Sequence, residues 1–143
     1  MQDLSTGVKE LLDEALPAIV STTNRDGTPQ SSVVWIERRG NDLAFFCDSK
    51  SVKLKNLADQ SAVVVLVLDP TRTFEPGAPC YVRISGRAGY KPMTDTAFPD
   101  RLARRYMPAD TFPHAGDYVE VVITSESWSG IGPFPDTTHG WGA

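Results

Sequence analysis

Apolar residues along most of the chain either alternate with polar residues or gather in short runs, which is the pattern of β-strands. Six segments predict strands: 18–23, 30–38, 43–47, 62–69, 80–90 and 118–124. The first three are separated only by the short polar stretches NRDG and RGND, which are typical of tight turns. In the first turn, Gly27 can take the positive φ that a hairpin requires. Connections this short predict antiparallel neighbours.

Three other segments have the three-and-four spacing of amphipathic helices. Residues 3–16 form the first, which Pro17 ends. The second follows Ser49 and Ser51 and ends near Asp59, and the third covers 94–106 with Thr94 as its N-cap. These helices are expected to lie around the sheet.

Other parts of the chain predict irregularities in this sheet. Residues 62–69 are apolar without alternation, so this strand is expected to be buried on both faces. Three prolines in 70–79 predict a loop, and the glycines at 86 and 89 predict a bend or bulge in the following strand. Residues 126–143 are rich in glycine and proline without periodicity, which predicts a flexible C-terminal tail.

Together these elements predict a mainly β fold, a closed antiparallel barrel of six strands with short peripheral helices. A barrel this small fills its interior with its own side chains. A ligand as large as a nucleotide would therefore lie in a groove at one end or between two subunits, which favours a dimer.

Length and composition agree with a single domain covering 1–143. The chain has 143 residues, of which 41% are hydrophobic and 22% charged, and its longest apolar run is too short to cross a bilayer. The N-terminus lacks the basic start and apolar segment of a secretory signal, so a cytoplasmic protein is expected. Cys47 and Cys80 lie in strand-like runs without metal-ligand spacing, which predicts buried free thiols and no metal site.

Positive charge is concentrated in one place. The net charge is −4, yet Lys50, Lys53 and Lys55 are three of only five lysines. They stand beside Ser49 and Ser51 at the start of a predicted helix, where hydroxyls, backbone N–H groups and the helix dipole favour an anion. We hypothesise a phosphate site rather than a nucleic-acid surface, since the chain as a whole is acidic. The alternative is an ordinary solvated helix face.

Four stretches, in this order, resemble a known family: PAIVSTTNRDGTPQSSVVWIE, LAFFCDSKSVKLKNLADQSAVVVLVLD, YVRISGRAGY and RLARRYM. They are similar to the split β-barrel flavin and deazaflavin proteins of the pyridoxamine 5′-phosphate oxidase superfamily, especially the branch that depends on coenzyme F420. The resemblance implies a homodimer that binds F420, or alternatively FMN, in grooves between its subunits.

The resemblance also implies which residues hold the cofactor. Its phosphate would be held by Ser51, Lys53, Lys55 and Asn56. The second strand would lie along the ring system through Gln30, Ser31, Ser32 and Val33. Phe46 and Cys47 would flank the ribityl chain. For each strand residue, ordinary sheet packing is the alternative.

The departures from the family narrow the expected activity. Enzymes that oxidise pyridoxamine phosphate carry basic residues on the second strand and at the C-terminus, which SSVVWIE and THGWGA lack. Val52 takes a position that is basic in the FMN enzymes, which favours F420. Haem, which some relatives bind, would need an axial ligand, and His114 and His139 lie in segments predicted to be exposed loops.

Two functions therefore fit the sequence. The first is hydride transfer between the cofactor and a small conjugated substrate, with the hard chemistry supplied by the cofactor. The second is a carrier that binds F420 or FMN without turnover. A substrate pocket could include Trp35, Tyr81 or Trp128, although core or interface packing is the alternative for each. Nothing in the sequence selects a catalytic residue.

Overall fold

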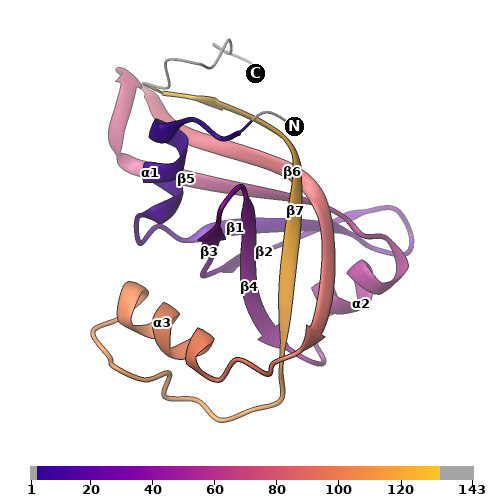
Figure 1. Ribbon diagram of the computed structural model, residues 1–143. Helices are drawn as coiled ribbons and strands as arrows, with labels where there is room; N and C mark the ends of the chain where they lie inside the picture. The colour runs from indigo at the N-terminus through magenta and orange to yellow at the C-terminus, as the bar shows by residue number, and fades with distance from the viewer. Residues whose placement is uncertain (1–2, 133–143) are drawn as a thin grey trace.

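The computed structural model of the protein describes residues 3–132, which form one seven-stranded sheet and three helices (Figure 1). The helices are α1 (Thr6–Asp13), α2 (Val52–Asp59) and α3 (Ala97–Tyr106). The strands are β1 (Ala18–Thr23), β2 (Pro29–Val34), β3 (Glu37–Arg39), β4 (Asp42–Asp48), β5 (Ala62–Glu75), β6 (Ala78–Pro92) and β7 (Tyr118–Ile131). Within these residues no helix is long and apolar enough to cross a membrane.

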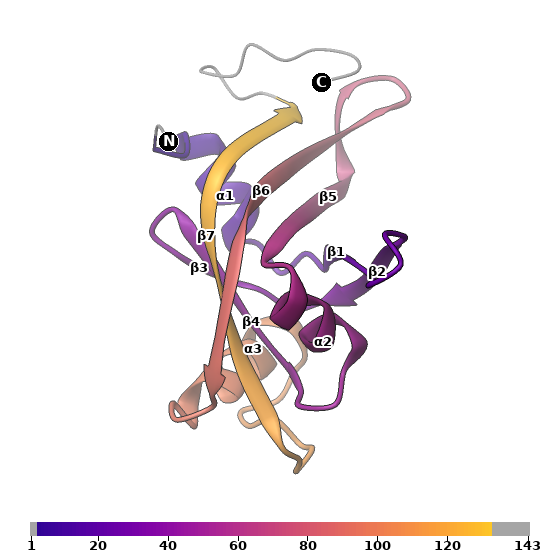
Figure 2. The ribbon, with the colours of Figure 1, turned by 90° about the vertical axis from the view of Figure 1, so that its right-hand side faces the viewer.

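The sheet is antiparallel throughout, in the order β2-β1-β5-β6-β7-β4-β3. Its two edge strands, β2 and β3, are consecutive in the chain and joined only by Trp35 and Ile36. Such a link spans at most about 11 Å, so the sheet must curl until its edges meet. The result is the expected mainly β split barrel, whose long strands β6 and β7 are visibly curved in Figure 2.

The number of strands differs from the prediction of six. Residues 30–38 were expected to form one strand, but the chain leaves β2 after Val34 and enters β3 at Glu37. Trp35 and Ile36 extend the apolar run of Val33 and Val34 across this break, so the sequence pattern gave no sign of it. The chain passes from one edge strand of the sheet to the other at this break, and it can do so because the barrel closure brings the two edges together.

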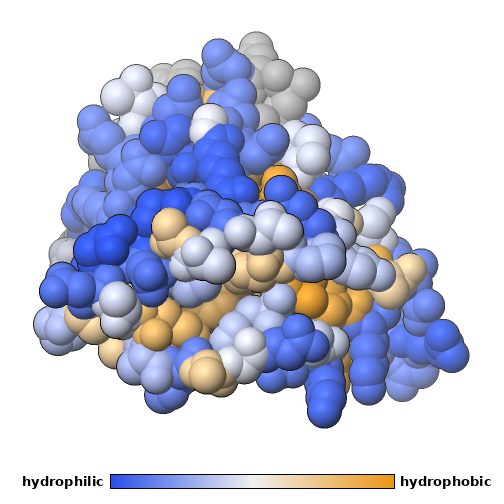
Figure 3. All heavy atoms as spheres, turned by 60° about the horizontal axis from the view of Figure 1, so that its bottom comes forward, coloured by the Kyte–Doolittle hydropathy of each residue, from blue (hydrophilic) through white to orange (hydrophobic). Residues whose placement is uncertain are grey.

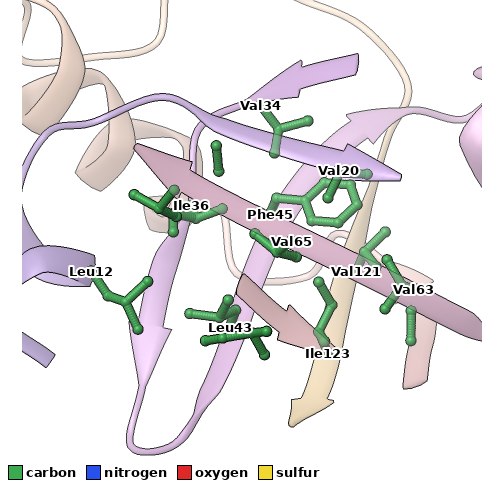
Figure 4. Close-up of a cluster of buried hydrophobic side chains, with 14 of the residues drawn as sticks. Leu12, Val20, Val34, Ile36, Leu43, Phe45, Val63, Val65, Val121 and Ile123 are labelled. Carbon is green, nitrogen blue, oxygen red and sulfur yellow. The ribbon is translucent and has the colours of Figure 1, made fainter. Parts of the chain in front are cut away.

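Branched and aromatic side chains from every side of the barrel fill its interior (Figure 4). Phe45 of β4 lies near the centre, with Val20 of β1 and Val65 of β5 beside it, and all three are completely buried. One face of α1 adds Val8 and Leu12 to the same core. The interior therefore has no room for a ligand, as expected for a barrel of this size.

The outer face of β5 is less buried than predicted. Val63, Val65 and Val67 point inward and are buried, whereas Leu68 keeps 38% of its surface exposed. On neighbouring strands Ile19 is 36% exposed and Val33 66% exposed. The apolar run therefore has one face in the core and a second face on an apolar outer surface.

Several boundaries also differ from the prediction. The helix expected over 3–16 covers only 6–13, where the side chain of Ser5 accepts a hydrogen bond from Val8 N. The third helix begins at Ala97, and the N-cap position belongs to Thr96, which makes no side-chain capping bond, rather than to Thr94. Residues 126–131 were expected to begin a flexible tail, but they continue β7 along β6. Residues 133–143 lie outside the described part of the chain.

The prolines of 70–79 do not produce a loop, and the segment forms the end of the β5–β6 hairpin. Register shifts after Asp69 and Thr73 accommodate the prolines. The buried Asp69 carboxylate accepts from the backbone N–H and hydroxyl of Thr71 and from the backbone and side chain of Arg72. Burial raises the pKa of Asp69, but these donors outweigh it and hold the pKa below its usual range.

The bulge predicted near Gly86 is present. Ser85 lies opposite Ser127 but Gly86 lies opposite Ser125, so Glu126 is an extra residue on β7. A Cβ atom at Gly86 would lie 2.2 Å from the backbone oxygen of Thr124. Glycine is therefore required here for the close approach of two backbones. The other predicted glycine turn is also confirmed, since Gly27 has φ +89°.

A chain of ion pairs fastens α3 to the outside of the barrel. Arg101 of α3 contacts Glu37 at 2.8 Å, and Arg39 joins Glu37 to Glu120. Lys91 Nζ lies 3.1 Å from the second carboxylate oxygen of Glu120, whose side chain is only 3% exposed. Burial raises the pKa of Glu120, while hydrogen bonds from Arg39 and Lys91 lower it by more, so the pKa lies below its ordinary value.

This depressed pKa makes Glu120 a source of acid sensitivity. A carboxylate with a lowered folded-state pKa stabilises the fold above its unfolded pKa, and that contribution disappears as the pH falls through the folded value. Glu120→Gln is expected to lower the free energy of unfolding by about 1–2 kcal/mol at pH 7, since Arg39 and Lys91 are partly exposed and screened. Urea unfolding at several pH values should show the difference between wild type and variant shrinking as the pH falls below the ordinary glutamate pKa of about 4.3. An equal difference at pH 7 and pH 3 would contradict this role.

Candidate cofactor site

A cleft of about 330 Å³ opens where the barrel is split. Its walls are the end of β2, the end of β4, the first turn of α2 and the loop between α3 and β7. The residues that line it are Val33, Val34, Trp35, Phe46, Cys47, Asp48, Ser51, Lys53 and Phe112. Segments distant in the sequence thus form one site.

Unpaired strand edges border this cleft. Within residues 3–132, β2 pairs only with β1, and β3 pairs only with residues 42–44 of β4. The end of β4 therefore pairs with β7 on one side and has no strand on the other. Edge strands expose backbone N–H and C=O groups. These groups can hydrogen-bond the polar edge of a planar heterocycle placed in the split.

Aromatic rings form the apolar part of the cleft. Trp35 stacks on Tyr106 with ring centroids 5.4 Å apart, and Phe112 meets Phe46 edge to face at 5.1 Å. The Tyr106 hydroxyl donates to Leu16 O at 2.9 Å and lies 3.3 Å from the donor Ile36 N. Burial raises the pKa of Tyr106. Figure 3 shows an apolar strip, bordered by hydrophilic side chains, on the face that carries α3.

The opposite end of the cleft suits an anion. Ser51 is the N-cap of α2, as predicted, and its Oγ accepts from Leu54 N at 3.4 Å. Lys53 lies in the first turn and also lines the cleft. The free N–H groups of that turn, the helix dipole and the ammonium group therefore favour a phosphate. Asp48 lines the cleft too, and its Oδ1 accepts from Lys50 N at 2.8 Å.

The structure does not bring all the predicted basic residues to this place. Lys55 lines a separate hollow of about 440 Å³ beside Arg25. Residues 53 and 55 stand two apart on a helix, which turns their side chains to different sides. Lys50 lines neither hollow, and Ser49 Oγ donates to Asp117 at 2.9 Å. In the chain as described, these basic and hydroxyl groups therefore do not all line one space.

Asn56 also lines the separate hollow, but its side chain has a structural role in the chain as described. It is buried, and its Nδ2 donates to Thr22 Oγ1 at 3.0 Å and to Asn24 Oδ1 at 2.8 Å. These bonds tie α2 to the end of β1 and the following turn. A role in holding phosphate remains a prediction.

Of the four predicted residues on β2, only Val33 lines the cleft. Ser31 bonds Ser21 across the sheet at 2.8 Å, and Gln30 lies 3.5 Å from Thr22 Oγ1. The hydroxyl of Ser32 is buried and has no hydrogen-bond partner in the described residues. Ordinary sheet contacts thus occupy the earlier part of β2, and the cleft lies at its end.

Phe46 and Cys47 both line the cleft as expected from their place at the end of β4. Cys47 and Cys80 are buried free thiols, as predicted. Burial raises the pKa of Cys80, which disfavours its reactive thiolate. His114, for which the sequence predicted an exposed loop position, is exposed.

Four residues that line the cleft were not among the predicted cofactor-binding residues: Val34, Trp35, Asp48 and Phe112. Val34 and Asp48 directly follow predicted site residues and Trp35 lies two positions after Val33, so extending the predicted stretches by one or two positions would have found all three. Phe112 belongs to a loop without periodicity, and no sequence signal connects it to the barrel split. Its place is set by the packing of α3.

The structure is a split β-barrel whose apolar cleft is bordered by open strand edges and by a helix N-terminus, a combination that suits a planar, phosphorylated molecule. The chain belongs to the pyridoxamine 5′-phosphate oxidase family, whose sequence profile matches residues 4–132. This family consists largely of flavin-dependent oxidoreductases. No curated protein sequence matches the chain.

Solved structures share the fold. An F420 reductase is 28% identical with a TM-score of 0.77, over 88% of this chain and 98% of the reductase. The hypothetical protein Rv2991 from Mycobacterium tuberculosis is 18% identical with a TM-score of 0.72, over 90% and 84% of the two chains. HupZ from Group A Streptococcus is 14% identical with a TM-score of 0.67, over 96% and 99%. The last two show the fold alone.

Proposed function

We propose that the protein is an F420-dependent oxidoreductase that transfers hydride between the cofactor and a small conjugated organic substrate. The observation that carries this proposal is a single cleft that joins an aromatic wall to the first turn of α2, with Ser51 and Lys53. Its shape and chemistry suit a molecule with a planar ring at one end and a phosphate at the other. The similarity to a solved F420 reductase supports F420 over other flavin-type cofactors.

Each part of the cleft has a task in this reaction. Lys53, the Ser51 cap and the N–H groups of the α2 first turn hold the phosphate. The unpaired edges of β2 and β4 would offer backbone groups to the polar edge of the ring, and Trp35 and Phe46 would exclude water from the cleft. F420, when bound, supplies the hydride chemistry. The protein therefore acts through binding and orientation.

A second copy of the chain completes the site in this proposal. Val33 lines the cleft and is also 66% exposed, and Ile19 and Leu68 extend the apolar surface over β1 and β5. Exposed apolar residues on one sheet face are typical of a subunit interface. A homodimer formed through this face would cover the open side of each cleft. Sedimentation analysis showing a monomer at micromolar concentration would contradict the dimer.

The alternative is an FMN enzyme, which the family as a whole favours, or a carrier without turnover. Titration of the purified protein with F420 and with FMN, followed by cofactor fluorescence, separates the cofactors. We expect F420 to bind at least about tenfold more tightly, a difference of about 1.4 kcal/mol. The reverse order supports FMN, and no binding of either rejects the proposal. Turnover of reduced F420 with a panel of quinones and enones then separates an enzyme from a carrier.

A further inference from the structure

A second hollow, of about 430 Å³, adjoins the cofactor cleft. It lies between the start of α3 and the loop that precedes β7, and Met93, Pro99 and Tyr118 form much of its apolar lining. Phe112 is the one described residue that lines both this outer hollow and the cleft. The two spaces therefore adjoin at the Phe112 side chain.

The Phe112 ring is held in place from several directions. It meets Phe46 at 5.1 Å, Tyr118 at 5.7 Å and Trp35 at 6.1 Å, all edge to face. Its backbone N–H donates to Asp100 Oδ1 of α3 at 2.9 Å. The flanking residues of the loop are exposed, whereas Phe112 is half-buried. The exposed loop thus places one aromatic side chain at the boundary between the cleft and the outer hollow.

The charge of the outer hollow is opposite to that of the phosphate end of the cleft. Asp100 and Asp117 line the hollow with His114, while no lysine or arginine is among its described lining residues. Among residues 3–132, the two carboxylates accept hydrogen bonds from the neutral donors Phe112 N and Ser49 Oγ, and neither forms an ion pair. A cation, or a neutral hydrogen-bond donor, is favoured here over an anion.

We propose that the outer hollow receives the second reactant of the redox reaction, a flat conjugated molecule that is neutral or cationic. Phe112 is then a specificity-determining residue, because its ring lies where the hollow meets the cleft and limits the size of a molecule that can reach the cofactor from this side. The assignment as a reactant site rests on the proposed function. Continuity with the cleft and the charge of the lining select this occupant over an anionic one.

The test uses two redox-inert probes of similar size and opposite charge, N-methylquinolinium and naphthalene-2-sulfonate. Each is titrated into the full-length, cofactor-free protein at pH 8 while backbone amide signals are followed by NMR. N-methylquinolinium should shift the amides of residues 112–118 and bind about tenfold more tightly than the sulfonate. Equal affinities, or shifts that avoid this loop, would overturn the proposal.

Three variants locate the source of the charge preference. Asp100→Asn and Asp117→Asn keep an acceptor oxygen for Phe112 N and Ser49 Oγ while removing the charge, and each should reduce the preference at least about threefold. Asp110→Asn is the matched control, since Asp110 belongs to the same loop but lines neither space. An equal loss in the control would mean a general charge effect and would reject the site.

The role of Phe112 is tested with cations of different size. Phe112→Ala should strengthen binding of a larger cation, N-methylacridinium, relative to N-methylquinolinium by about fivefold or more, and Phe112→Leu should have a smaller effect. If the ratio of the two affinities did not change, Phe112 would not limit the size of the bound molecule. Failure of F420 to bind while the cationic probes bind this loop would reject the proposed function and leave the cation site. Tight F420 binding without a charge preference of the probes would reject the site and leave the proposed function.

Discussion

Replacing Lys53 with alanine is expected to weaken F420 binding by about 1.5–3 kcal/mol, which is roughly a 10- to 150-fold increase in Kd. Lys53 lines the cleft in the first turn of α2, where its charge adds to the Ser51 cap and the free N–H groups. A contact between an ammonium group and a phosphate is charge-assisted and therefore stronger than a neutral hydrogen bond. Titration of cofactor fluorescence with wild-type and variant protein measures the change.

Lys55→Ala is the matched control for this experiment. It removes the same charge from the same helix, but Lys55 lines the separate hollow beside Arg25. Its Kd should stay within about threefold of the wild-type value, because a charge outside the pocket is screened by solvent. Equal losses in both variants would show general electrostatic attraction, and an unchanged Kd for Lys53→Ala would reject its phosphate role.

Gly86→Ala is expected to lower the free energy of unfolding by about 3 kcal/mol, at the upper end of the usual cost of overpacking. The new Cβ would lie 2.2 Å from Thr124 O and 3.2 Å from a methyl group of Ile123. The nearest of these atoms belongs to the backbone of β7, so the strand itself must move. Urea unfolding measures the loss, and the melting temperature should fall by about 10 °C.

Gly89→Ala provides the comparison on the same strand, three residues along. A Cβ at Gly89 meets no atom within 4 Å. This variant should change the free energy of unfolding by less than about 1 kcal/mol, the scale of an ordinary glycine-to-alanine effect. If both variants were equally stable, the bulge would be able to relax, and Gly86 would not be required for the approach of β6 and β7.

The fold could be predicted from the sequence wherever short-range physics decides it. Alternation identified the strands, Asp26-Gly27 identified a tight turn, and Ser51 identified the start of α2. The predictions failed where the local structure depends on contacts with segments distant in the sequence. Pro70 and Pro79 suggested a loop, but pairing between β5 and β6 continues through bulges held by Asp69. Local propensity could not anticipate a hairpin whose stability comes from a neighbouring strand and a buried carboxylate.

The residues of the candidate site also fall into those that the sequence could predict and those that it could not. Phe46, Cys47, Ser51 and Lys53 line the cleft and follow one another along a short stretch of sequence, so their proximity could be inferred. The different direction of Lys55 follows from helix geometry, but the hollow that it lines exists only because the β1–β2 turn lies beside α2. Phe112 had no sequence signal. Its position depends on the packing of α3 against the outside of the barrel.

The sequence by itself determined that this protein is a mainly β barrel with a helix that starts after Ser51, because alternation, turn residues and capping act over a few neighbouring residues. Only the tertiary structure decided that β2 and β3 lie at opposite edges of the sheet, that the cleft lies between the ends of β2 and β4, and that Phe112 stands between two hollows. These features depend on contacts between segments far apart in the chain, and their geometry follows from the closure of the barrel.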